Sequence, residues 1–253
     1  LEQITPDIRN VKIKKCNNCC HHWYPWVPKF DDLMKMYNSH IRSNKNMNLN
    51  SKNNYIFKEF KDIMKYQSKD DFSLLDYGSG FGIWTTIASK LDIDTYAFEP
   101  SLERGSMAIK NKIKVISKIE DIYKLEKSFD LINLEQVLEH VINPLETLQI
   151  ISKICNNKTI IRIRVPNISR SKEGKNLYKF WPYKNNKMHT LSPYEHIHGF
   201  TQKSLRYLCI NAGYKIDYCF ILRFKPMLFI RYFLGIFFNR FSSTTIYCKL
   251  NFK

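Results

Sequence analysis

Short apolar runs alternate with helix-like segments along most of this chain of 253 residues, and this alternation constrains the fold more than any other feature. The runs with strand character lie at residues 72–77, 94–98, 113–117, 129–134 and 158–165, and helix-like segments lie near 82–90, 102–110 and 144–154. Strands that alternate with helices build right-handed βαβ units and a parallel sheet. With 44% hydrophobic residues the chain has enough apolar material for one such core and a small appendage. We therefore predict an α/β fold.

The two ends of the chain depart from this alternation. A helical pattern is expected at 54–66, because apolar residues recur there at helical spacing. The C-terminal part predicts, in order, a helix at 201–212, a strand at 214–224, an apolar basic stretch at 226–241 and a strand at 243–251, with the strands closing the sheet as an edge hairpin. Residues 1–53 are predicted to form a cysteine-containing N-terminal module and linker, and residues 54–253 the main domain. Because residue 1 is Leu and not Met, we expect either a domain of a longer polypeptide, fused to other domains upstream, or a chain that lacks its natural start.

Three glycines follow the first predicted strand directly, in the segment Asp-Tyr-Gly-Ser-Gly-Phe-Gly at 76–82. Glycines at such a point let the backbone turn sharply and approach a ligand closely. In a dinucleotide-binding fingerprint the third glycine follows the second by three residues, whereas here it follows by two, which argues against a nicotinamide cofactor. The second predicted strand ends at Glu99, whose carboxylate is placed to accept hydrogen bonds from two ribose hydroxyls.

The combination of these motifs resembles class I S-adenosylmethionine (SAM)-dependent methyltransferases. The residues that carry the resemblance are the Leu-Asp-x-Gly-x-Gly-x-Gly segment at 75–82, Glu99, Phe-Asp-Leu-Ile at 129–132, and Val-Leu-Glu-His-Val-Ile-Asn-Pro at 137–144. The nearest match is the small-molecule and sugar methyltransferases with a Leu-Glu-His signature after the fourth strand, and it spans residues 55–252. The resemblance implies a Rossmann-like, seven-stranded, mostly parallel sheet with the last strand antiparallel and SAM across the carboxyl ends of the first strands.

The resemblance also implies roles for individual residues. The cofactor residues it implies are Asp76 at the methionine amino group, Gly78, Gly80 and Gly82 along the methionine and ribose, Glu99 at the ribose hydroxyls, and Glu120 and Asp121 at the adenine. The segment that contains Glu120 and Asp121 lacks the Gly-Asp lead that the family usually has there.

Two histidines are candidates for the base that removes a proton from a methyl acceptor. Histidine titrates near neutral pH, and in similar sugar methyltransferases histidines at the positions of His140 and His196 line the acceptor pocket. The alternative is that both histidines only brace their loops. The candidate substrate-binding residues are Tyr37, Glu195, His198 and Arg170. Cations and aromatics at 169–184, together with Arg162 and Arg164, suit an anionic glycan or nucleotide-sugar acceptor, and a plain solvated loop is the alternative.

A zinc site is a further hypothesis for the N-terminal module. Cys16 and Cys19 have the spacing of one zinc knuckle, and the aromatic and proline-rich segment after them resembles the junction between a zinc ribbon and a sugar methyltransferase. Four-coordinate zinc needs more ligands. A second cysteine pair could precede residue 1, His21 and His22 could take its place, or no metal binds.

The formal charge of +17 has two explanations. Lys, Asn and Ile are abundant throughout, which is typical of an AT-rich genome, whereas an anionic partner such as nucleic acid would also favour such a charge. The stretch 226–241 suits packing, a dimer face or a peripheral membrane contact. No apolar window approaches the roughly 20 residues of a membrane span and no signal peptide is present, so we expect a cytoplasmic protein.

The leading functional hypothesis is methyl transfer from SAM to a hydroxyl of a sugar, glycan or nucleotide-sugar-like molecule. Oxygen is favoured over carbon because the further C-terminal domain of sugar C-methyltransferases is absent. An RNA or protein methyltransferase is the alternative among enzymes, although the chain lacks an Asn/Asp-Pro-Pro-Tyr motif. A non-catalytic SAM-binding module of a larger glycan-synthesis protein is the alternative from another class.

Overall fold

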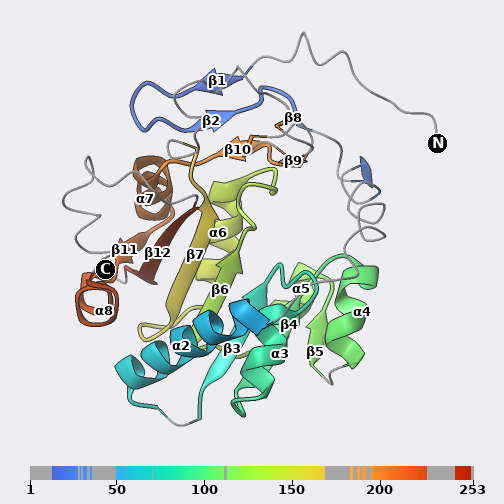
Figure 1. Ribbon diagram of the computed structural model, residues 1–253, viewed down its shortest axis with the longest axis vertical. Helices are drawn as coiled ribbons and strands as arrows, with labels where there is room; N and C mark the ends of the chain where they lie inside the picture. Colours follow the sequence, from blue (N-terminus) through green and yellow to red (C-terminus); the bar gives the residue numbers. More distant parts are fainter. Residues whose placement is uncertain are drawn as a thin grey trace.

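The structure is a computed structural model, and it describes residues 13–27, 29, 31–32, 35, 50–69, 71–110, 113–168, 183–184, 187–188, 190–191, 195–226 and 243–251. Its main element is a seven-stranded sheet with the order β11-β12-β7-β6-β3-β4-β5 (Figure 1). The strands are β3 (Ser73–Tyr77), β4 (Asp94–Phe98), β5 (Lys114–Ile116), β6 (Leu131–Glu135), β7 (Ile160–Pro166), β11 (Tyr214–Ile216) and β12 (Ser243–Leu250). Strand β12 runs antiparallel to both of its neighbours, and the pairs from β7 to β5 are parallel. The predicted Rossmann-like sheet with an antiparallel last strand is confirmed.

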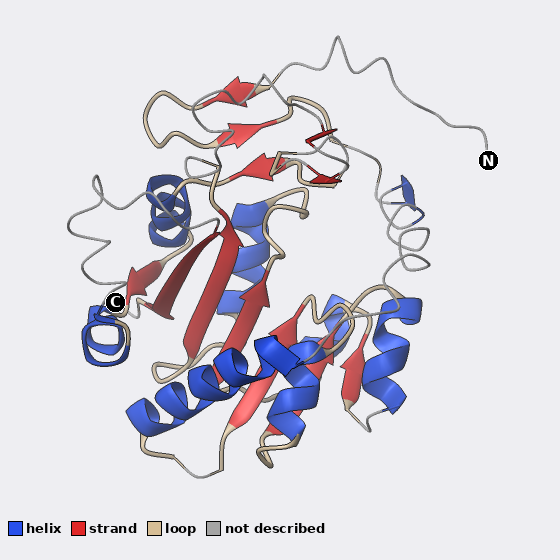
Figure 2. Ribbon diagram, in the orientation of Figure 1, coloured by secondary structure: helices blue, strands red, loops and turns tan. Residues whose placement is uncertain are grey.

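Helices lie on both sides of this sheet (Figure 2). They are α2 (Asn50–Gln67), α3 (Ile83–Ser89), α4 (Leu102–Lys110), α5 (Ile119–Tyr123), α6 (Pro144–Ser152), α7 (Gln202–Asn211) and α8 (Tyr218–Phe224). Helix α2 contacts α3 and α8, while α6 contacts α7. The central strands are therefore buried on both faces, which is why their sequences are apolar runs rather than alternating patterns.

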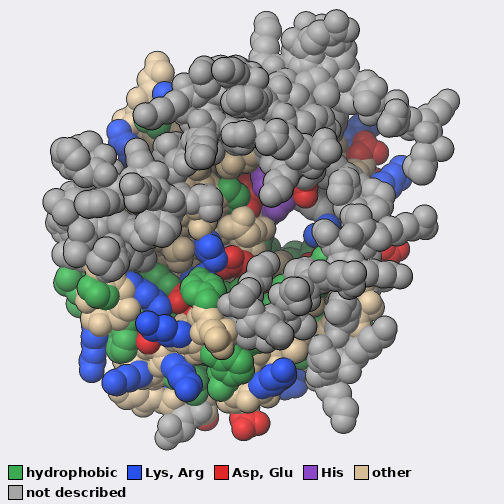
Figure 3. Space-filling model, viewed as in Figure 1, with side chains coloured by type: hydrophobic (Ala, Val, Ile, Leu, Met, Phe, Trp, Pro, Cys, Tyr) green, Lys and Arg blue, Asp and Glu red, His purple; other side chains and the backbone are tan. Residues whose placement is uncertain are grey.

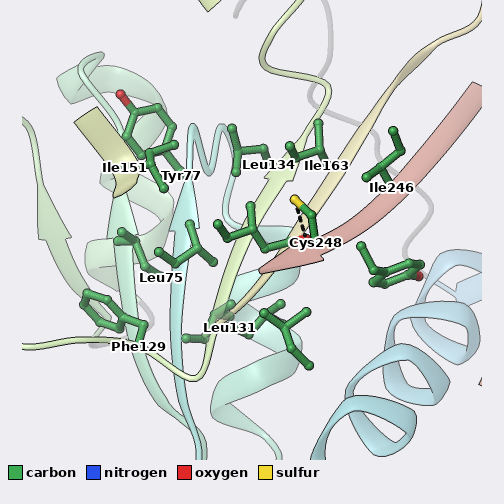
Figure 4. Close-up of a cluster of buried hydrophobic side chains, with 14 of the residues drawn as sticks. Leu75, Tyr77, Phe129, Leu131, Leu134, Ile151, Ile163, Ile246 and Cys248 are labelled. Atoms are coloured by element: carbon green, nitrogen blue, oxygen red, sulfur yellow. Dashed lines mark hydrogen bonds between the residues drawn. The ribbon is translucent and has the colours of Figure 1, made fainter. Parts of the chain in front are cut away.

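The core is built from aliphatic side chains of the central strands and their covering helices (Figure 4). Leu75, Leu131, Leu134 and Ile163 are fully buried. Each such side chain contributes about 1.5–3 kcal/mol relative to its exposed state. This burial holds the carboxyl ends of the parallel strands in a fixed arrangement.

The strand order places a crossover beside β3. From β3 the chain proceeds outward to β4 and β5, then returns to the other side of β3 and continues through β6 and β7. In open α/β sheets ligands bind at the carboxyl edge where the strand order reverses in this way. The carboxyl ends of β3, β4 and β6 are therefore the expected location of the site.

The predicted strand at 214–224 is wrong over most of its length. Strand β11 ends at Ile216, and α8 begins two residues later. The side chain of Asp217 accepts a hydrogen bond from the backbone N–H of Phe220 at 3.0 Å, which caps the helix. Phe220 and Ile221 on this helix are buried, so the apolar run packs as one face of a helix.

A second, small sheet lies beyond the carboxyl ends of the main strands (Figure 1). It consists of β1 (Lys14–Lys15), β2 (His22–Trp23) and β10 (His198–Gly199), all antiparallel. Tyr24 packs with Ile168, Leu191 and Ile197 in a separate buried cluster. The described part of the N-terminal segment is thus joined to the main domain through β10. Whether residues 1–53 form a module of their own stays a prediction.

A further hairpin pairs β8 (Tyr183–Lys184) with β9 (Lys187–Met188). Tyr37, Arg170 and all of the 226–241 stretch except Pro226 lie outside the described residues. No helix among the described residues is long and apolar enough to cross a membrane.

Candidate cofactor and acceptor site

The glycine loop after β3 has a backbone that favours glycine. Gly78 and Gly80 have φ angles of 74° and 54°, a region that residues with a Cβ rarely adopt. A Cβ on Gly78 would lie 2.8 Å from Cγ2 of Val137, so this position is also sterically closed. A Cβ on Gly80 would meet no atom within 4 Å. The loop is therefore packed against the protein at Gly78 and open at Gly80.

Glu99 follows β4 directly and lies against this loop. Its Oε2 accepts a hydrogen bond from the Gly80 N–H at 2.8 Å, and its Oε1 accepts one from the Ser101 N–H at 3.0 Å. The residue is 7% exposed. Burial raises the pKa of Glu99 above its usual range, while the two N–H donors oppose the rise. The carboxylate is thus held in one orientation beside the open part of the loop.

Asp76, near the end of β3, is a buried carboxyl group beside the loop. Its Oδ1 accepts a hydrogen bond from Nδ2 of Asn133 at 2.8 Å. Burial raises the pKa of Asp76 to about 7, although the Asn133 bond opposes this effect. At neutral pH the group is therefore poised between its neutral and charged forms, and a nearby positive charge would favour the charged form.

A buried arginine lies behind Asp76 and was misassigned by the sequence analysis. Arg162 has no exposed surface, and its guanidinium donates to Glu59 at 3.1 Å, Glu135 at 2.7 Å and Asn133 at 2.8 Å. It also lies 4.4 Å from the ring centroid of Trp84. The prediction that Arg162 faces an anionic acceptor is wrong, because its donors are used by the protein itself.

Arg164 is similarly engaged, since it donates to Glu135 at 3.2 Å and to Ser243 at 3.0 Å. Glu59 binds a second cation, Lys225, at 2.7 Å. The sequence contained no local signal for this network, because its members lie on α2, β6, β7 and the segment after α8. These hydrogen bonds connect α2, β6 and the segment after α8 to β7.

Helix α5 follows β5 and carries the two predicted adenine contacts, Glu120 and Asp121. Asp121 pairs with Lys124 at 2.7 Å and its side chain is 43% exposed. Since β3, β4 and β5 are adjacent and parallel, the predicted cofactor residues follow three neighbouring strands at one edge of the sheet. Their contacts with adenine stay a prediction.

The fit of these residues to SAM rests on charge and space. SAM carries a positive amino group and a ribose with two hydroxyls. Asp76 offers a buried carboxyl group that a positive charge would ionise, and Glu99 offers an oriented carboxylate for hydroxyl donors. The open space at Gly80 lies beside Glu99. The chain therefore has the groups that this cofactor requires.

The two candidate catalytic histidines are far apart in the sequence, but their rings are in contact. The rings of His140 and His196 are edge to face with centroids 4.6 Å apart. His140 follows β6, and His196 precedes β10. Nδ1 of His140 lies 2.7 Å from the carbonyl oxygen of Glu195, and Nδ1 of His196 lies 3.1 Å from that of Thr190. Because a carbonyl oxygen only accepts, both Nδ1 atoms carry the proton.

Glu139 adds a carboxylate to this pair, and the sequence analysis did not single it out. It is 1% exposed, and neither of its carboxylate oxygens has a hydrogen-bond partner among the described residues. Its Oε1 lies 3.9 Å from Nε2 of His140. Burial raises the pKa of Glu139 to about 8. Burial likewise lowers the pKa of His140 to about 3, so its ring is neutral at physiological pH. Figure 3 shows histidine and acidic atoms in a hollow at the centre of one face of the molecule.

Of the other predicted acceptor residues, the structure places His198 and Glu195. His198 lies in β10 beside the pair, but its Nδ1 contacts Nε2 of His21 at 3.1 Å and its Nε2 lies 3.3 Å from the carbonyl oxygen of Ile142. Glu195 contributes the carbonyl that orients His140. Tyr37 and Arg170 cannot be placed, since they lie outside the described residues.

Cys16 and Cys19 lie in one tight turn of the N-terminal segment. The backbone N–H of Cys20 donates to the carbonyl oxygen of Cys16 at 3.0 Å, and both candidate thiols are free. His22 contacts the carbonyl oxygen of Cys20 at 3.1 Å, and His21 contacts His198. Within the part of the chain that the structure describes, the group of three possible metal ligands is Glu139, His140 and His196, away from the cysteines. Zinc at Cys16 and Cys19 stays a prediction.

The sheet order, the glycine loop and the acidic residue after the second main strand together define the class I SAM-binding α/β fold. The chain belongs to the methyltransferase domain family, whose sequence profile matches residues 48–218. Its cofactor is S-adenosylmethionine.

A curated relative matches part of the chain, and solved structures agree with the fold. An uncharacterized protein of Methanocaldococcus jannaschii is 31% identical over 120 residues, which are 47% of this chain and 52% of the relative. The chain thus matches about half the length of this curated relative. The fold is similar to that of the plantazolicin methyltransferase BpumL in complex with a pentazolic desmethylPZN analog and SAH, with a TM-score of 0.59, 19% identity, and coverage of 88% of this chain and 93% of that one. It is also similar to an S-adenosylmethionine-dependent methyltransferase from Clostridium acetobutylicum, with a TM-score of 0.54, 10% identity, and coverage of 88% and 99%.

Proposed function

We propose that this protein transfers a methyl group from SAM to a hydroxyl oxygen of a small molecule such as a sugar, a glycan or a nucleotide sugar. The observation that carries the proposal is the pair of histidines, His140 and His196, beside the buried carboxylate of Glu139. A cluster of this kind suits an acceptor that must lose a proton when it is methylated.

The chemistry defines what the chain has to do. When bound, SAM supplies a methyl group on a positively charged sulfur. In the transfer the sulfur–carbon bond breaks, its electron pair stays on sulfur, an oxygen–carbon bond forms, and the hydroxyl proton passes to a base. The protein therefore has to align the acceptor oxygen behind the methyl group and remove one proton.

The described residues divide these tasks between two ends of the site. Asp76, Glu99 and the glycine loop hold the cofactor at the ends of β3 and β4. His140 follows β6, the neighbour of β3 on the other side, so the histidine pair belongs to the acceptor end. The neutral ring of His140 is able to accept a hydrogen bond from a hydroxyl, and Glu139, with a pKa raised to about 8, is the stronger base of the two.

The test is a methyl-transfer assay with labelled SAM. The acceptor panel should include oligosaccharides, nucleotide sugars, RNA, proteins and azole-containing peptides, since similar structures hold desmethylPZN analogs. Label in the carbohydrate fraction, on oxygen when the product is analysed by NMR, is the expected result. Label in RNA or protein, or on nitrogen or carbon, would overturn the proposal. Tight SAM binding with no transfer to any acceptor would instead favour a non-catalytic module.

A further inference from the structure

We propose that Glu139, His140 and His196, here called the His–Glu cluster, form a binding site for a divalent first-row transition-metal ion whose remaining coordination position takes the acceptor oxygen. The metal site stands on the structure alone. Its role toward the acceptor rests on the proposed function.

Three possible metal-donor groups converge in the cluster. One possible ligand atom from each member of the cluster lies within 4.8 Å of the other two. Zinc bonds of about 2.0–2.2 Å place tetrahedral ligand atoms roughly 3.4 Å apart. Metal binding would therefore draw the three atoms closer together, from at most 4.8 Å to that separation.

The side chain of Glu139 is buried in an unusual environment for a carboxylate. It is 1% exposed and neither carboxylate oxygen has a hydrogen-bond partner among the described residues, whereas other buried carboxylates in this chain do have partners. A buried carboxylate without a hydrogen-bond partner or a nearby cation carries a large desolvation cost, so burial favours its neutral form until a cation binds. One Oε atom of Glu195, the residue before His196, is also buried without such a partner. A cation between these groups would offset that cost.

The imidazoles of His140 and His196 are both oriented by backbone carbonyl groups. Each Nδ1 donates to a backbone carbonyl oxygen, which places the lone pair of a neutral ring on Nε2. Nε2 of His140 is the atom that lies 3.9 Å from Glu139. Carbonyl partners behind the second ring nitrogen are the usual outer shell of metal-bound histidines, because they hold the ring and its tautomer.

The ligand types indicate which ions would bind. Two imidazoles and a carboxylate suit Zn²⁺, Mn²⁺ or Fe²⁺ better than Ca²⁺, which prefers oxygen ligands. Three protein ligands leave at least one position open in tetrahedral geometry, as in catalytic zinc sites. A cation there lowers the pKa of a coordinated hydroxyl, so the acceptor would lose its proton to solvent at neutral pH. The cluster would then act as a ligand set rather than as the base.

The experiment measures metal binding directly, in a protein that also carries Cys16→Ser and Cys19→Ser so that thiols do not contribute. Metal content and competition with a chromophoric chelator should give one Zn²⁺ per chain. Glu139→Gln and His196→Gln should each lower the affinity at least about 100-fold. Asp71→Asn, which changes a carboxylate outside the cluster with a side chain that is 91% exposed, should leave it unchanged. Equal affinity in the Glu139→Gln protein, or no binding of Zn²⁺, Mn²⁺ or Fe²⁺ at millimolar concentration, would overturn the proposal.

Two further measurements cover a variant that fails to fold and separate this proposal from the proposed function. Co²⁺ bound to the protein with intact Glu139 should give a low-coordinate d–d spectrum without a sulfur charge-transfer band, and the spectrum of a fully hydrated ion would contradict the site. Methyl transfer that survives chelation in metal-free protein would overturn the metal's role but leave O-methylation standing. Metal binding without transfer to any hydroxyl would leave the metal site standing and overturn the proposed O-methylation.

Discussion

The backbone N–H of Gly80 donates a hydrogen bond to the carboxylate of Glu99 at 2.8 Å, which joins the loop after β3 to the residue after β4. The same carboxylate is the group that we assign to the ribose hydroxyls. One side chain therefore holds the glycine loop and is also the predicted ligand of the cofactor ribose.

Replacing Glu99 by Ala should weaken SAM binding about 10- to 100-fold. Each charge-assisted hydrogen bond to a ribose hydroxyl contributes roughly 1.5–3 kcal/mol, and 1.4 kcal/mol is a factor of ten. Isothermal titration calorimetry measures the change. Asp94→Asn is the control, because Asp94 begins the same strand but pairs with Lys114 at the protein surface. An unchanged affinity in Glu99→Ala would remove this residue from the cofactor site.

SAM affinity should rise with pH up to about 7 and then level off. Asp76 has a pKa of about 7 in the empty site, so below that pH it is protonated, and the cationic amino group of SAM has to displace the proton before it can pair with the carboxylate. Below pH 7 the affinity for SAM should fall by nearly tenfold per pH unit. Calorimetry in buffers of different ionisation enthalpy should detect proton release on binding.

The Asp76→Asn protein is the comparison for this pH dependence. It should bind SAM more weakly, with an affinity that no longer changes between pH 6 and 8 in the same way. A wild-type affinity that is flat over this interval would show that Asp76 does not pair with the amino group.

Substituting Arg162 by Met should destabilise the fold by about 3–5 kcal/mol. The change removes the cation that Glu59 and Glu135 share and the donor to Asn133, and breaking a buried pair costs that much, although Lys225 still binds Glu59 and Arg164 still binds Glu135. Urea unfolding gives the free energy. Arg164→Met is the control, since its side chain is 31% exposed, and it should cost less than half as much. Equal effects of the two substitutions would contradict the central position of Arg162.

The glycine loop offers a test by double substitution. Gly78→Ala should cost more stability than Gly80→Ala, because both impose about 1–2 kcal/mol of backbone strain but only the first brings a Cβ to 2.8 Å from Val137. In a Val137→Ala background the difference between the two should shrink. Additive effects of Gly78→Ala and Val137→Ala would mean that no such contact exists.

His140→Ala and His196→Ala should each leave SAM affinity within about threefold of the wild type and reduce turnover by about 10²–10⁴. The reason is that we assign these histidines to the methyl acceptor, and Asp76 and Glu99 to the cofactor. His22→Gln should have no effect on either quantity. Full turnover in both histidine variants would exclude the pair from the acceptor site, whether as base or as metal ligands.

Much of the fold follows from local sequence. The apolar runs at β3, β4, β6 and β7 are short and bounded by turns, so their length and spacing identify buried parallel strands. The glycine loop and Glu99 were likewise predictable, because a positive φ and a strand-end carboxylate are local requirements. The strand predicted through 217–224 failed because an apolar run alone does not distinguish a buried strand from a helix face, and the Asp217 cap decides for the helix.

The sequence by itself determined the alternation of strands and helices, the position of the cofactor loop and the class of cofactor. Only the tertiary structure decided which groups surround Arg162 and Glu139, and how closely His196 approaches His140. The physical reason is range. Strand and turn preferences act over a few neighbouring residues, whereas burial of a charge and convergence of ligands depend on the strand order and on the small sheet of β1, β2 and β10, which brings residues 13–27 and 195–200 together beyond the carboxyl edge of the main sheet.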